Sequence, residues 1–492
     1  MIRPVHVTST RLGELIASCP AEYADVAITG ATADNRQVEP GDLFFAIPGA
    51  TAHGARYANS AVASGAVAVI TDTDGADFVT ADVPVIILAD VARHVGDIAA
   101  AVYGFPAQKL TTYAVTGTNG KTTTAFMIDH ILNTLGETTG LIGTVAVKIA
   151  GQEVPAQLTT PQPADLQAML AALVERGGTS LVMEVSSHAI AQGRIESINY
   201  SVAGFTNLTQ DHLDYHNTLT EYFEAKALLF TEKFSRVGVA ITDTPWGEEL
   251  VKRGNDRVAA LASQPDQPAG WRFTGQADGT LTLRGENWGT ITTSTNLPGD
   301  FNIANAALAI AMVAKAGYSA EAISAALLAS NGVNPQVPGR MEVVAEAPRI
   351  VVDFAHNEDA LTKAIEALRP STQGNLIVIT GSAGDRDVTK RPLMAKTVAE
   401  RADVLVITDD DPHSEDPAHI RADLISGIPT DTNWIEIADR REAITAMVTD
   451  ACAEDTILIA GRGHETIQDM NGTLVNLDDR EVAREAYAKR RA

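Results

Sequence analysis

Basic residues, cysteine and long apolar runs are all scarce in this chain, and each shortage excludes a class of protein. Among 492 residues, 37 are Lys or Arg and 62 are Asp or Glu, which gives a net charge of −25. Nucleic acids and anionic membrane surfaces both need a basic footprint, so neither is expected as a partner. Two cysteines are too few for a disulfide framework, which favours a cytoplasmic protein. No apolar run approaches the roughly 18 residues that a membrane span requires, and residues 1–5 carry no apolar signal core.

What the chain does have is a glycine-rich turn between an apolar run, 113–116, and a helical pattern, 123–135. The turn reads Gly117-Thr118-Asn119-Gly120-Lys121-Thr122-Thr123-Thr124. A strand, a glycine turn and a helix N-terminus together bind phosphate through backbone N–H groups, with the lysine adding a point charge and the following threonine a hydroxyl for Mg²⁺. The usual P-loop spacing would place glycine at Val115, so this turn is a shortened variant. The alternative, a glycine turn before an ordinary core helix, is weak because Gly-Lys-Thr in this context is specific.

The length predicts about three domains, and the composition shifts place them at 1–106, 107–336 and 337–492. The first reads as a small α/β unit with strands at 41–49 and 66–71. The second carries the glycine-rich turn and buried strands at 180–185 and 201–206. In the third, apolar runs at 350–352, 376–379, 404–407 and 457–459 alternate with helices, which predicts a mostly parallel, doubly wound sheet. The fold class is therefore α/β with three domains.

Several polar residues stand where such folds place ligands. Glu184 ends a buried strand, a suitable position for a carboxylate that holds Mg²⁺ beside a P-loop, although an ordinary loop carboxylate is the alternative. His212 lies in a segment, 207–216, dense in ligand types, and could bind a metal, while Asp211 and Asp214 have a spacing that could instead cap the next helix. Arg340 follows a Pro-Gly pair at a domain boundary and could reach a phosphate, while Asp353, at a strand end, could bind ribose hydroxyls. Lys226, on a helical pattern beside glutamate, reads from the pattern alone as solvated.

Motifs of this kind recur in order along nearly the whole chain. They are the turn 117–124, Glu184-Val185-Ser186-Ser187-His188, 207–216, Lys226, 299–305, Gly339-Arg340-Met341-Glu342, 353–357, 384–387, 390–392 and Gly461-Arg462-Gly463-His464-Glu465. Together they resemble the Mur ligase family, and within it the members that form the tripeptide. The resemblance implies a first domain that binds UDP, with Asn35 where the family usually has Ser, a central P-loop ATPase domain, and a Rossmann-like domain that binds the incoming amino acid.

The implied reaction transfers phosphate from ATP to the D-glutamate γ-carboxyl of UDP-MurNAc-L-Ala-D-Glu, after which an amine displaces phosphate. The resemblance implies catalytic roles for Lys121, His212 and Lys226, and two Mg²⁺ ions held by Thr122 and Glu184 and by His212 and a carbamylated Lys226. For ATP it implies Gly117, Thr118, Asn119, Gly120, Lys121, Thr122, Thr123, Asn302, Asn305, Arg340 and Asp353. For the UDP-dipeptide it implies Asn35, Thr159, Thr160, Ser186, Gln192 and Arg194. For the amino acid it implies Arg386, Gly461 and Glu465.

The segment Asp410-Asp411-Pro412-His413 bears on which amino acid is added. Family members that use meso-diaminopimelate carry Asp-Asn-Pro-Arg, and the arginine pairs with the distal carboxylate. Here His413 replaces that arginine and Asp411 adds a carboxylate, so a bidentate partner for a carboxylate is missing. Asp411 and His413 suit a bare side-chain ammonium, and we expect L-lysine or L-ornithine, with meso-diaminopimelate as the alternative.

Two further alternatives belong to other classes. A folylpolyglutamate synthetase shares the ligase core, but the N-terminal segment 34–54 and the loop 462–465 speak against it. A nucleotide-gated binding protein would lack the acyl-acceptor loops that this chain carries. We expect a cytoplasmic monomer that uses Mg²⁺, ATP, UDP-MurNAc-dipeptide and a diamino acid, with no nucleic-acid or membrane partner.

Overall fold

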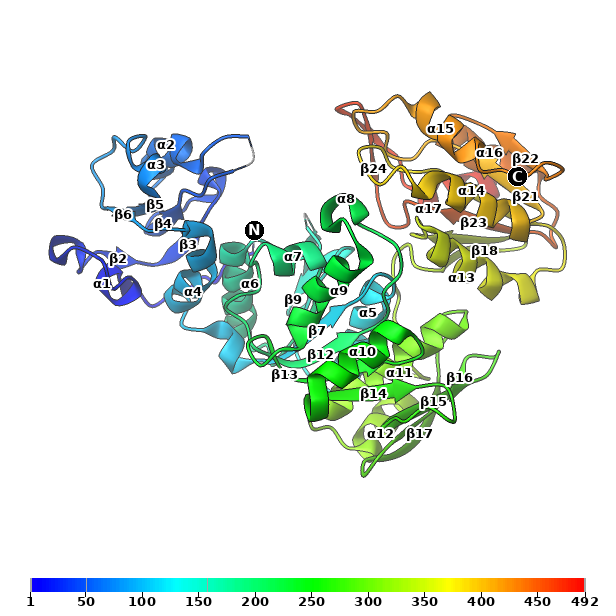
Figure 1. Cartoon of the computed structure of the whole chain (residues 1–492), viewed down its shortest axis with the longest axis horizontal. Helices are drawn as coiled ribbons and strands as arrows, with labels where there is room; N and C mark the ends of the chain where they lie inside the picture. Colours follow the sequence, from blue (N-terminus) through cyan, green and yellow to red (C-terminus); the bar gives the residue numbers. More distant parts are fainter. Residues whose placement is uncertain (1, 50, 157, 491–492) are drawn as a thin grey trace.

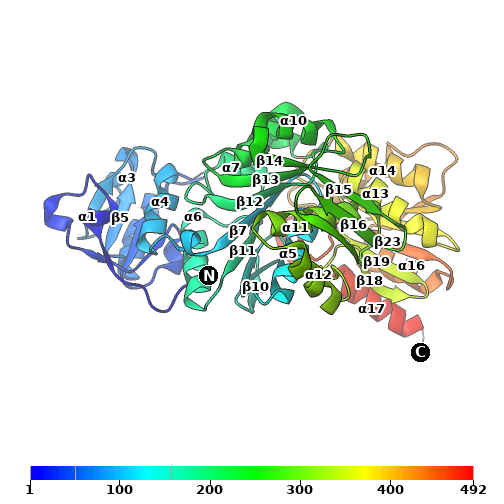
Figure 2. The same cartoon turned by 90° about the horizontal axis from the view of Figure 1, so that it is seen from below.

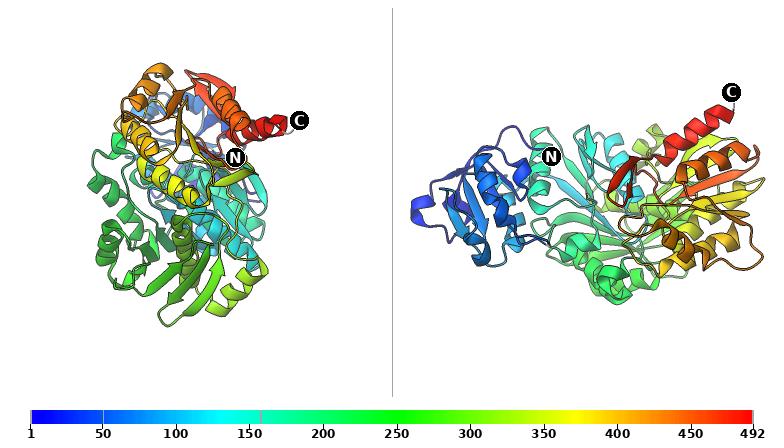
Figure 3. Two further views of the ribbon diagram at one scale, coloured as in Figure 1. Left: turned by 90° about the vertical axis from the view of Figure 1, so that its right-hand side faces the viewer. Right: turned by 90° about the horizontal axis from the view of Figure 1, so that it is seen from above.

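Three α/β domains follow one another along the chain (Figure 1). The computed structural model describes residues 2–49, 51–156 and 158–490, so the outermost residues of the predicted first and third domains lie outside the described ranges. Seen from below (Figure 2) and from above (Figure 3, right), the domains form an elongated row with the N-terminal domain at one end. Within the described ranges, no helix combines the length and the apolar character needed to cross a membrane.

The N-terminal domain is built on four parallel strands in the order β3-β4-β5-β6. The strands are Gly30–Thr32, Asp42–Phe45, Ala68–Thr71 and Val85–Ile87, and the helices α1–α4 are Leu12–Leu15, Ala58–Ala63, Thr73–Ala76 and Val91–Val102; β1, Thr10–Arg11, pairs with β2, Ala27–Ile28. The domain docks on α6 of the central domain, because Ala164 and Ala168 of that helix belong to the N-terminal core. The backbone N–H groups of Val5 and His6 also donate to the Glu175 carboxylate, at 2.8 and 2.6 Å.

The central domain has an eleven-stranded sheet in the order β10-β9-β8-β11-β7-β12-β13-β14-β15-β16-β17. The seven central strands in this order, β8-β11-β7-β12-β13-β14-β15, are parallel. Antiparallel hairpins extend the sheet at both edges. Strands β7–β17 are Thr111–Thr116, Thr139–Ile142, Ala146–Ile149, Gln152–Pro155, Ser180–Glu184, Tyr200–Phe205, Ser235–Ile241, Val258–Ala262, Trp271–Gly275, Thr280–Gly285 and Gly289–Ser294. Helices α5–α12 are Lys121–Thr134, Pro163–Glu175, Ser187–Ala191, Leu213–His216, Leu219–Ala227, Pro245–Gly254, Asp300–Lys315 and Ala320–Ala329.

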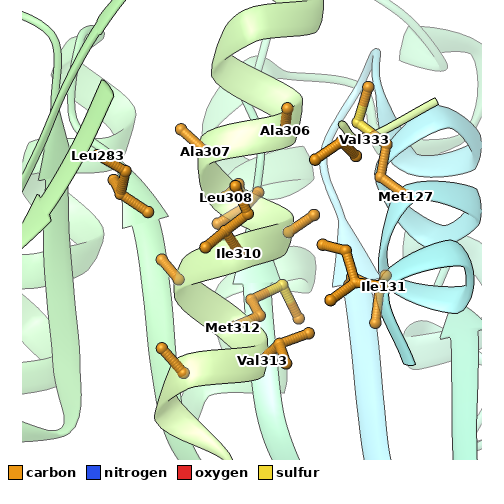
Figure 4. Close-up of a cluster of buried hydrophobic side chains, with 14 of the residues drawn as sticks. Met127, Ile131, Leu283, Ala306, Ala307, Leu308, Ile310, Met312, Val313 and Val333 are labelled. Atoms are coloured by element: carbon orange, nitrogen blue, oxygen red, sulfur yellow. The ribbon is translucent and has the colours of Figure 1, made fainter. Parts of the chain in front are cut away.

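Packing fixes the helix that follows the glycine-rich turn. Helix α5 begins at Lys121, two residues earlier than the sequence pattern predicts. Its apolar residues Met127 and Ile131 face the buried helix α11, whose other side packs toward Leu283 of β16 (Figure 4). Burying such side chains contributes roughly 1.5–3 kcal/mol each relative to exposure. The position of the phosphate-binding turn is therefore set by one of the main hydrophobic cores of the molecule.

The C-terminal domain has a six-stranded sheet in the order β18-β19-β23-β20-β21-β22, parallel except for β18. Strands β18–β23 are Glu342–Glu346, Arg349–Asp353, Leu376–Thr380, Val404–Ile407, Trp434–Glu436 and Thr456–Ala460, and β24, Ile467–Met470, pairs with β25, Thr473–Asn476. Helices α13–α17 are Glu358–Leu368, Lys390–Arg401, Pro417–Ile425, Arg440–Asp450 and Asp479–Arg490. The four strands predicted for this domain are β19, β20, β21 and β23, and the predicted mostly parallel sheet is confirmed. Its strand ends, where ligands bind in such folds, carry Asp353, Gly381, Thr408 and Gly461.

Candidate functional site

The glycine-rich turn has the backbone that an anion-binding loop needs. Gly117 and Gly120 have φ of 149° and 89°, which L side chains rarely adopt, and a Cβ at Gly117 would lie 1.9 Å from the Thr206 hydroxyl oxygen. The Lys121 ammonium donates to the carbonyl oxygens of Gly117 and Thr118, at 3.1 and 2.8 Å. Burial lowers the pKa of Lys121, with Glu184 acting in the opposite direction. The turn therefore offers backbone N–H groups, the helix N-terminus and a half-buried cation in one place.

Glu184 is a buried carboxylate held by neutral donors. Only 1% of the residue is exposed. Its Oε2 accepts from the Thr122 hydroxyl at 2.9 Å, and its Oε1 accepts from the Thr144 N–H at 2.8 Å. A buried carboxylate beside a hydroxyl is the hard-oxygen donor set that Mg²⁺ prefers. Thr122 and Glu184 therefore fit the predicted ion site.

The pattern-based interpretation of Lys226 as a solvated lysine is wrong. The residue is 1% exposed; its ammonium donates to the Gly117 carbonyl oxygen at 2.8 Å and lies 4.4 Å from the centre of the Tyr222 ring. Burial lowers the pKa of Lys226 well below its usual value, and the Lys121 charge lowers it further. Helix periodicity missed this because the Gly117 carbonyl group that accepts from Lys226 lies 109 positions away in the sequence.

His212 lies on the same side of the turn. It precedes α8 with a φ of 55°, and its ring meets that of His188 edge-on at 5.0 Å. Burial lowers the pKa of His212 to about 3, so its imidazole is neutral and can serve as a metal ligand. Asp211 does not cap α8 through its side chain. Its carboxylate instead lies near His356 and Asn357 of the C-terminal domain, at 3.5 and 3.4 Å.

Arg340 and Asp353 bring the C-terminal domain to the phosphate-binding turn. An Arg340 guanidinium nitrogen donates to the Thr122 hydroxyl at 3.2 Å, and the guanidinium lies 4.2 Å from the centre of the Phe354 ring. Asp353 accepts from the N–H groups of Met341 and Ala355, at 2.7 and 2.9 Å. Asn119 of the turn also donates to Asp359 of α13 at 2.9 Å. The turn, which belongs to the central domain, is thus also contacted by the C-terminal domain.

Asn302 and Asn305 lie on the buried helix α11 behind the turn. Asn302 donates to the Pro298 carbonyl oxygen at 2.8 Å, and Asn305 lies close enough to Gly120 that a Cβ there would be 2.6 Å from its amide oxygen. A cavity of about 1130 Å³ adjoins Asn305 and is also lined by Phe301 and Lys363. This cavity is large enough for a nucleoside.

Except for Asn35, the residues predicted for the UDP-dipeptide gather around the end of β11. Thr160 donates to the Glu184 carbonyl oxygen at 2.9 Å and accepts from the Ser186 N–H at 3.2 Å. Arg194 donates to the Thr160 carbonyl oxygen at 2.9 Å and also to the Gln192 amide oxygen. Asn35 lies in the N-terminal domain, in the short helix Asn35–Gln37 that Asp34 caps.

The predicted amino-acid end is acidic. Carboxylate oxygens of Asp410, Asp411 and Glu465 all lie within 4.8 Å of one another. The buried Arg462 guanidinium contacts Asp411, which offsets part of that charge. Burial raises the pKa of Glu465, with Asp410 acting in the same direction and Arg462 opposing it, to about 8.

His413 does not stand alone in the loop that follows β21. Its ring Nδ1 lies 3.1 Å from a carboxylate oxygen of Asp469, and its backbone N–H donates to the Asp469 carbonyl oxygen at 3.2 Å. The Arg386 guanidinium, in the preceding loop, donates to the Asp385 carbonyl oxygen at 3.3 Å.

One cleft of about 660 Å³ joins most of these residues. The predicted residues that line it are Thr118, Asn119, Gly120, Lys121, Thr122, Thr123, Thr159, Thr160, Glu184, Ser186, Arg194, His212, Asn302, Asn305, Arg340, Asp353, Arg386, Asp411, His413, Gly461 and Glu465. Among the described residues, Gly117, Lys226, Gln192 and Asn35 are predicted site residues that do not line it. Gly117 and Lys226 lie directly behind its wall, in contact with each other.

Comparison with known proteins decides the family. Three family profiles match the chain: the Mur ligase family catalytic domain over residues 27–103, the Mur ligase middle domain over 115–313, and the Mur ligase glutamate ligase domain over 339–463. Over 99% of its length and 98% of the relative's, the chain is 41% identical to UDP-N-acetylmuramoyl-L-alanyl-D-glutamate–2,6-diaminopimelate ligase of Streptomyces coelicolor. This chain belongs to the Mur ligase family.

Two further likenesses agree with that assignment. The UDP-N-acetylmuramyl-tripeptide synthetase of Leifsonia xyli is 38% identical, over 98% of this chain and 97% of the relative. A solved structure of a UDP-N-acetylmuramoyl-L-alanyl-D-glutamate–2,6-diaminopimelate ligase is 30% identical with a TM-score of 0.66, over 99% of this chain and all of that one. This Mur ligase therefore has the three-domain α/β architecture of its relatives.

Sequence reasoning assigned no role to several residues in the cleft of this Mur ligase. Thr144 and Asp211 line it, and no motif singled out Thr144. Arg462 and His464 lie within a recognised motif, but their contacts with Asp411 and with the Thr144 backbone depend on the folded chain. These residues were missed because their partners come from distant segments.

Proposed function

We propose that this Mur ligase uses ATP to join a diamino acid to the D-glutamate γ-carboxyl of UDP-MurNAc-L-Ala-D-Glu, a step of peptidoglycan synthesis. The observation that supports this best is the single cleft, in which the phosphate-binding turn, the buried Glu184 and the acidic Glu465 end face one another across two domains. An enzyme that activates a carboxylate and then admits an amine needs these three features together.

The chain's own residues can serve each stage of this reaction. Lys121 and Arg340 would face the ATP phosphates, and the cavity beside Asn302 and Asn305 would hold the nucleoside. The carboxylate oxygen attacks the γ-phosphorus, ADP leaves, the acceptor amine attacks the acyl carbon, and inorganic phosphate leaves. Mg²⁺, held by Thr122 and Glu184 and by His212 with a carbamylated Lys226, would neutralise the charge that gathers on the phosphate oxygens.

The remaining residues are assigned to the UDP-dipeptide, the ribose of ATP and the amino acid. We assign the UDP-dipeptide to Thr159, Thr160, Ser186, Gln192 and Arg194, with Asn35 on the N-terminal domain. Asp353 would bind the ribose hydroxyls, and Gly461, Glu465 and Arg386 would bind the amino and carboxyl groups that all acceptors share. An acidic pocket suits the acceptor ammonium.

For the acceptor, the relatives support 2,6-diaminopimelate better than the lysine or ornithine expected from the sequence. The relative from Streptomyces coelicolor and the solved structure are both named for 2,6-diaminopimelate. We therefore propose 2,6-diaminopimelate first. Lysine or ornithine stays the second candidate, because His413 faces Asp469 where a carboxylate-binding arginine would be needed.

A competition assay tests both levels of this proposal. Purified enzyme is given ATP, Mg²⁺, UDP-MurNAc-L-Ala-D-Glu and an equimolar mixture of meso-diaminopimelate, L-lysine and L-ornithine, and the products are identified by mass spectrometry. A diaminopimelate product supports the first candidate, and a lysine or ornithine product the second. Phosphate release with a folate substrate, or no ADP with any acceptor, would instead favour a folylpolyglutamate synthetase or a nucleotide-gated binding protein.

A further inference from the structure

Thr144 lies in the turn between β8 and β9 and contacts Glu184 twice. Its backbone N–H donates to Glu184 Oε1 at 2.8 Å, and its hydroxyl donates to Oε2 at 3.2 Å. The preceding Gly143 permits this approach, because a Cβ there would lie 2.1 Å from Glu184 Oε1. The turn is therefore shaped around the Glu184 carboxylate.

The Thr144 hydroxyl also contacts the loop predicted to bind the UDP-dipeptide. Its oxygen lies 3.1 Å from the Thr159 hydroxyl oxygen. A hydroxyl has one proton to donate, and that of Thr144 goes to the carboxylate, which can only accept. Thr159 must then donate to Thr144. The hydrogen bonds run in one direction, from Thr159 to Thr144 to Glu184.

This arrangement leaves the Thr159 oxygen with lone pairs only, so it can accept a hydrogen bond from a substrate. A second series of hydrogen bonds runs from Arg340 to the Thr122 hydroxyl and on to Glu184 Oε2. Both series therefore end on Glu184 Oε2. Glu184 thus joins the substrate loop on one side to the C-terminal domain on the other.

We propose that Thr144 is a positioning residue that fixes both the Glu184 carboxylate and the Thr159 hydroxyl, so that the UDP-dipeptide loop and the ion site are aligned by one side chain. The proposal rests on the function proposed above. It goes beyond that function because Thr144 touches neither ATP nor the amino acid in the assigned roles; it acts through Thr159 and Glu184.

The test compares Thr144→Val, which keeps the shape and removes the hydroxyl, with Thr144→Ser, which keeps the hydroxyl. Calorimetry without ATP should show the Kd for UDP-MurNAc-L-Ala-D-Glu raised about tenfold in T144V and within about threefold of wild type in T144S, because a hydrogen bond to a charged network is lost only in the first. The Mg²⁺ concentration for half-maximal turnover should rise in parallel, while the KM for the amino acid stays unchanged.

Thr282→Val is the matched control. The Thr282 hydroxyl oxygen also lies 3.1 Å from another threonine hydroxyl, that of Thr292, but on the exposed face of β16 and β17, outside the cleft. It should leave the Kd and all KM values unchanged. A T144V enzyme with wild-type constants, or a T144S enzyme as impaired as T144V, would overturn the role of Thr144. A wild-type enzyme that forms no tripeptide with any acceptor would instead overturn the proposed function.

Discussion

At the scale of single residues, the cleft gathers cations that oppose the charge of the whole chain. The chain carries a net charge of −25, yet Lys121 and Arg340 both face the phosphate-binding turn. A polyphosphate can bind such a protein only through local cations and backbone N–H groups, because the overall field repels it. The function therefore depends on a few half-buried positive charges.

Replacing Lys121 by alanine should lower kcat/KM for ATP by at least about 10²-fold, the usual cost of removing one donor that stabilises the transition state. The measurement is ADP formation coupled to tripeptide synthesis, with circular dichroism to confirm folding. Lys315→Ala, which removes an exposed lysine at the end of α11, is the control and should have no effect. Normal turnover in K121A would contradict the role of the turn.

Glu465 should make amino-acid binding depend on pH. Burial raises the pKa of this carboxyl to about 8 from an ordinary value of 4.5, so it is neutral below pH 8 and ionised above. An ionised carboxylate binds an ammonium better, and the KM for the amino acid should fall as pH rises from 7 to 9.

Glu465→Gln provides the comparison that isolates this group from titration of the substrate amine. At pH 9 the KM of the variant for the amino acid should be higher than that of wild type. Between pH 7 and 9 the variant should keep only the pH dependence that comes from the substrate amine. The folded state keeps its proton up to about pH 8 while an unfolded chain loses it near 4.5, so Glu465 costs stability as pH rises through that window. E465Q should therefore have the higher Tm above pH 8; identical pH profiles and Tm values would refute the shift.

At the scale of elements, an ion pair between α16 and α17 supports the loop that carries Glu465. Arg440 and Asp479 are fully buried, 2.7 Å apart, and Arg440 also donates to the carbonyl oxygen of Ala460, the last residue of β23, at 2.9 Å. The strand end and two helices therefore meet at one guanidinium.

Arg440→Met should lower the stability of the C-terminal domain by about 3–5 kcal/mol, because it leaves Asp479 charged and buried without a partner. Differential scanning calorimetry should show this loss of stability as a lower Tm for the unfolding transition of the C-terminal domain. The double variant Arg440→Met/Asp479→Leu should recover much of it, since no buried charge remains. A double variant as unstable as the single one would show that packing, and not charge, causes the loss.

The strands β19, β20, β21 and β23 of the C-terminal domain could be predicted because each is a short apolar run with both faces largely buried, as at 376–379 and 457–459. The hairpins that extend the central sheet were missed, although β16 alternates polar and apolar residues, because that run is short and its partner β17 has a single apolar residue, Ile291. The glycine-rich turn is local chemistry and was visible in the sequence. The burial of Lys226 and the contacts of Thr144 depend on segments far apart in the chain, and no local pattern contains them.

At the scale of the whole molecule, the link between the central and C-terminal domains passes through Gly339, between α12 and β18. This residue has a φ of 62°, and a Cβ on it would lie 2.1 Å from the Gly463 carbonyl carbon and the His464 nitrogen. The link thus packs directly on the backbone of the loop that carries Glu465, so the course of the chain between domains and the position of the amino-acid site are set together.

Gly339→Ala should therefore lower kcat/KM for the amino acid at least about tenfold, since one of two pieces of backbone must move. Gly472→Ala is a matched control, because Gly472 has a similar φ of 80° but an added Cβ would meet no atom within 4 Å. Both variants should lose about 1 kcal/mol of stability from the left-handed backbone, and G339A should lose more because its Cβ meets the Gly463–His464 backbone; only G339A should lose activity. Steady-state kinetics beside calorimetry separates the two effects: equal activity in both variants would show that contact between the link and the loop does not align the domains for catalysis.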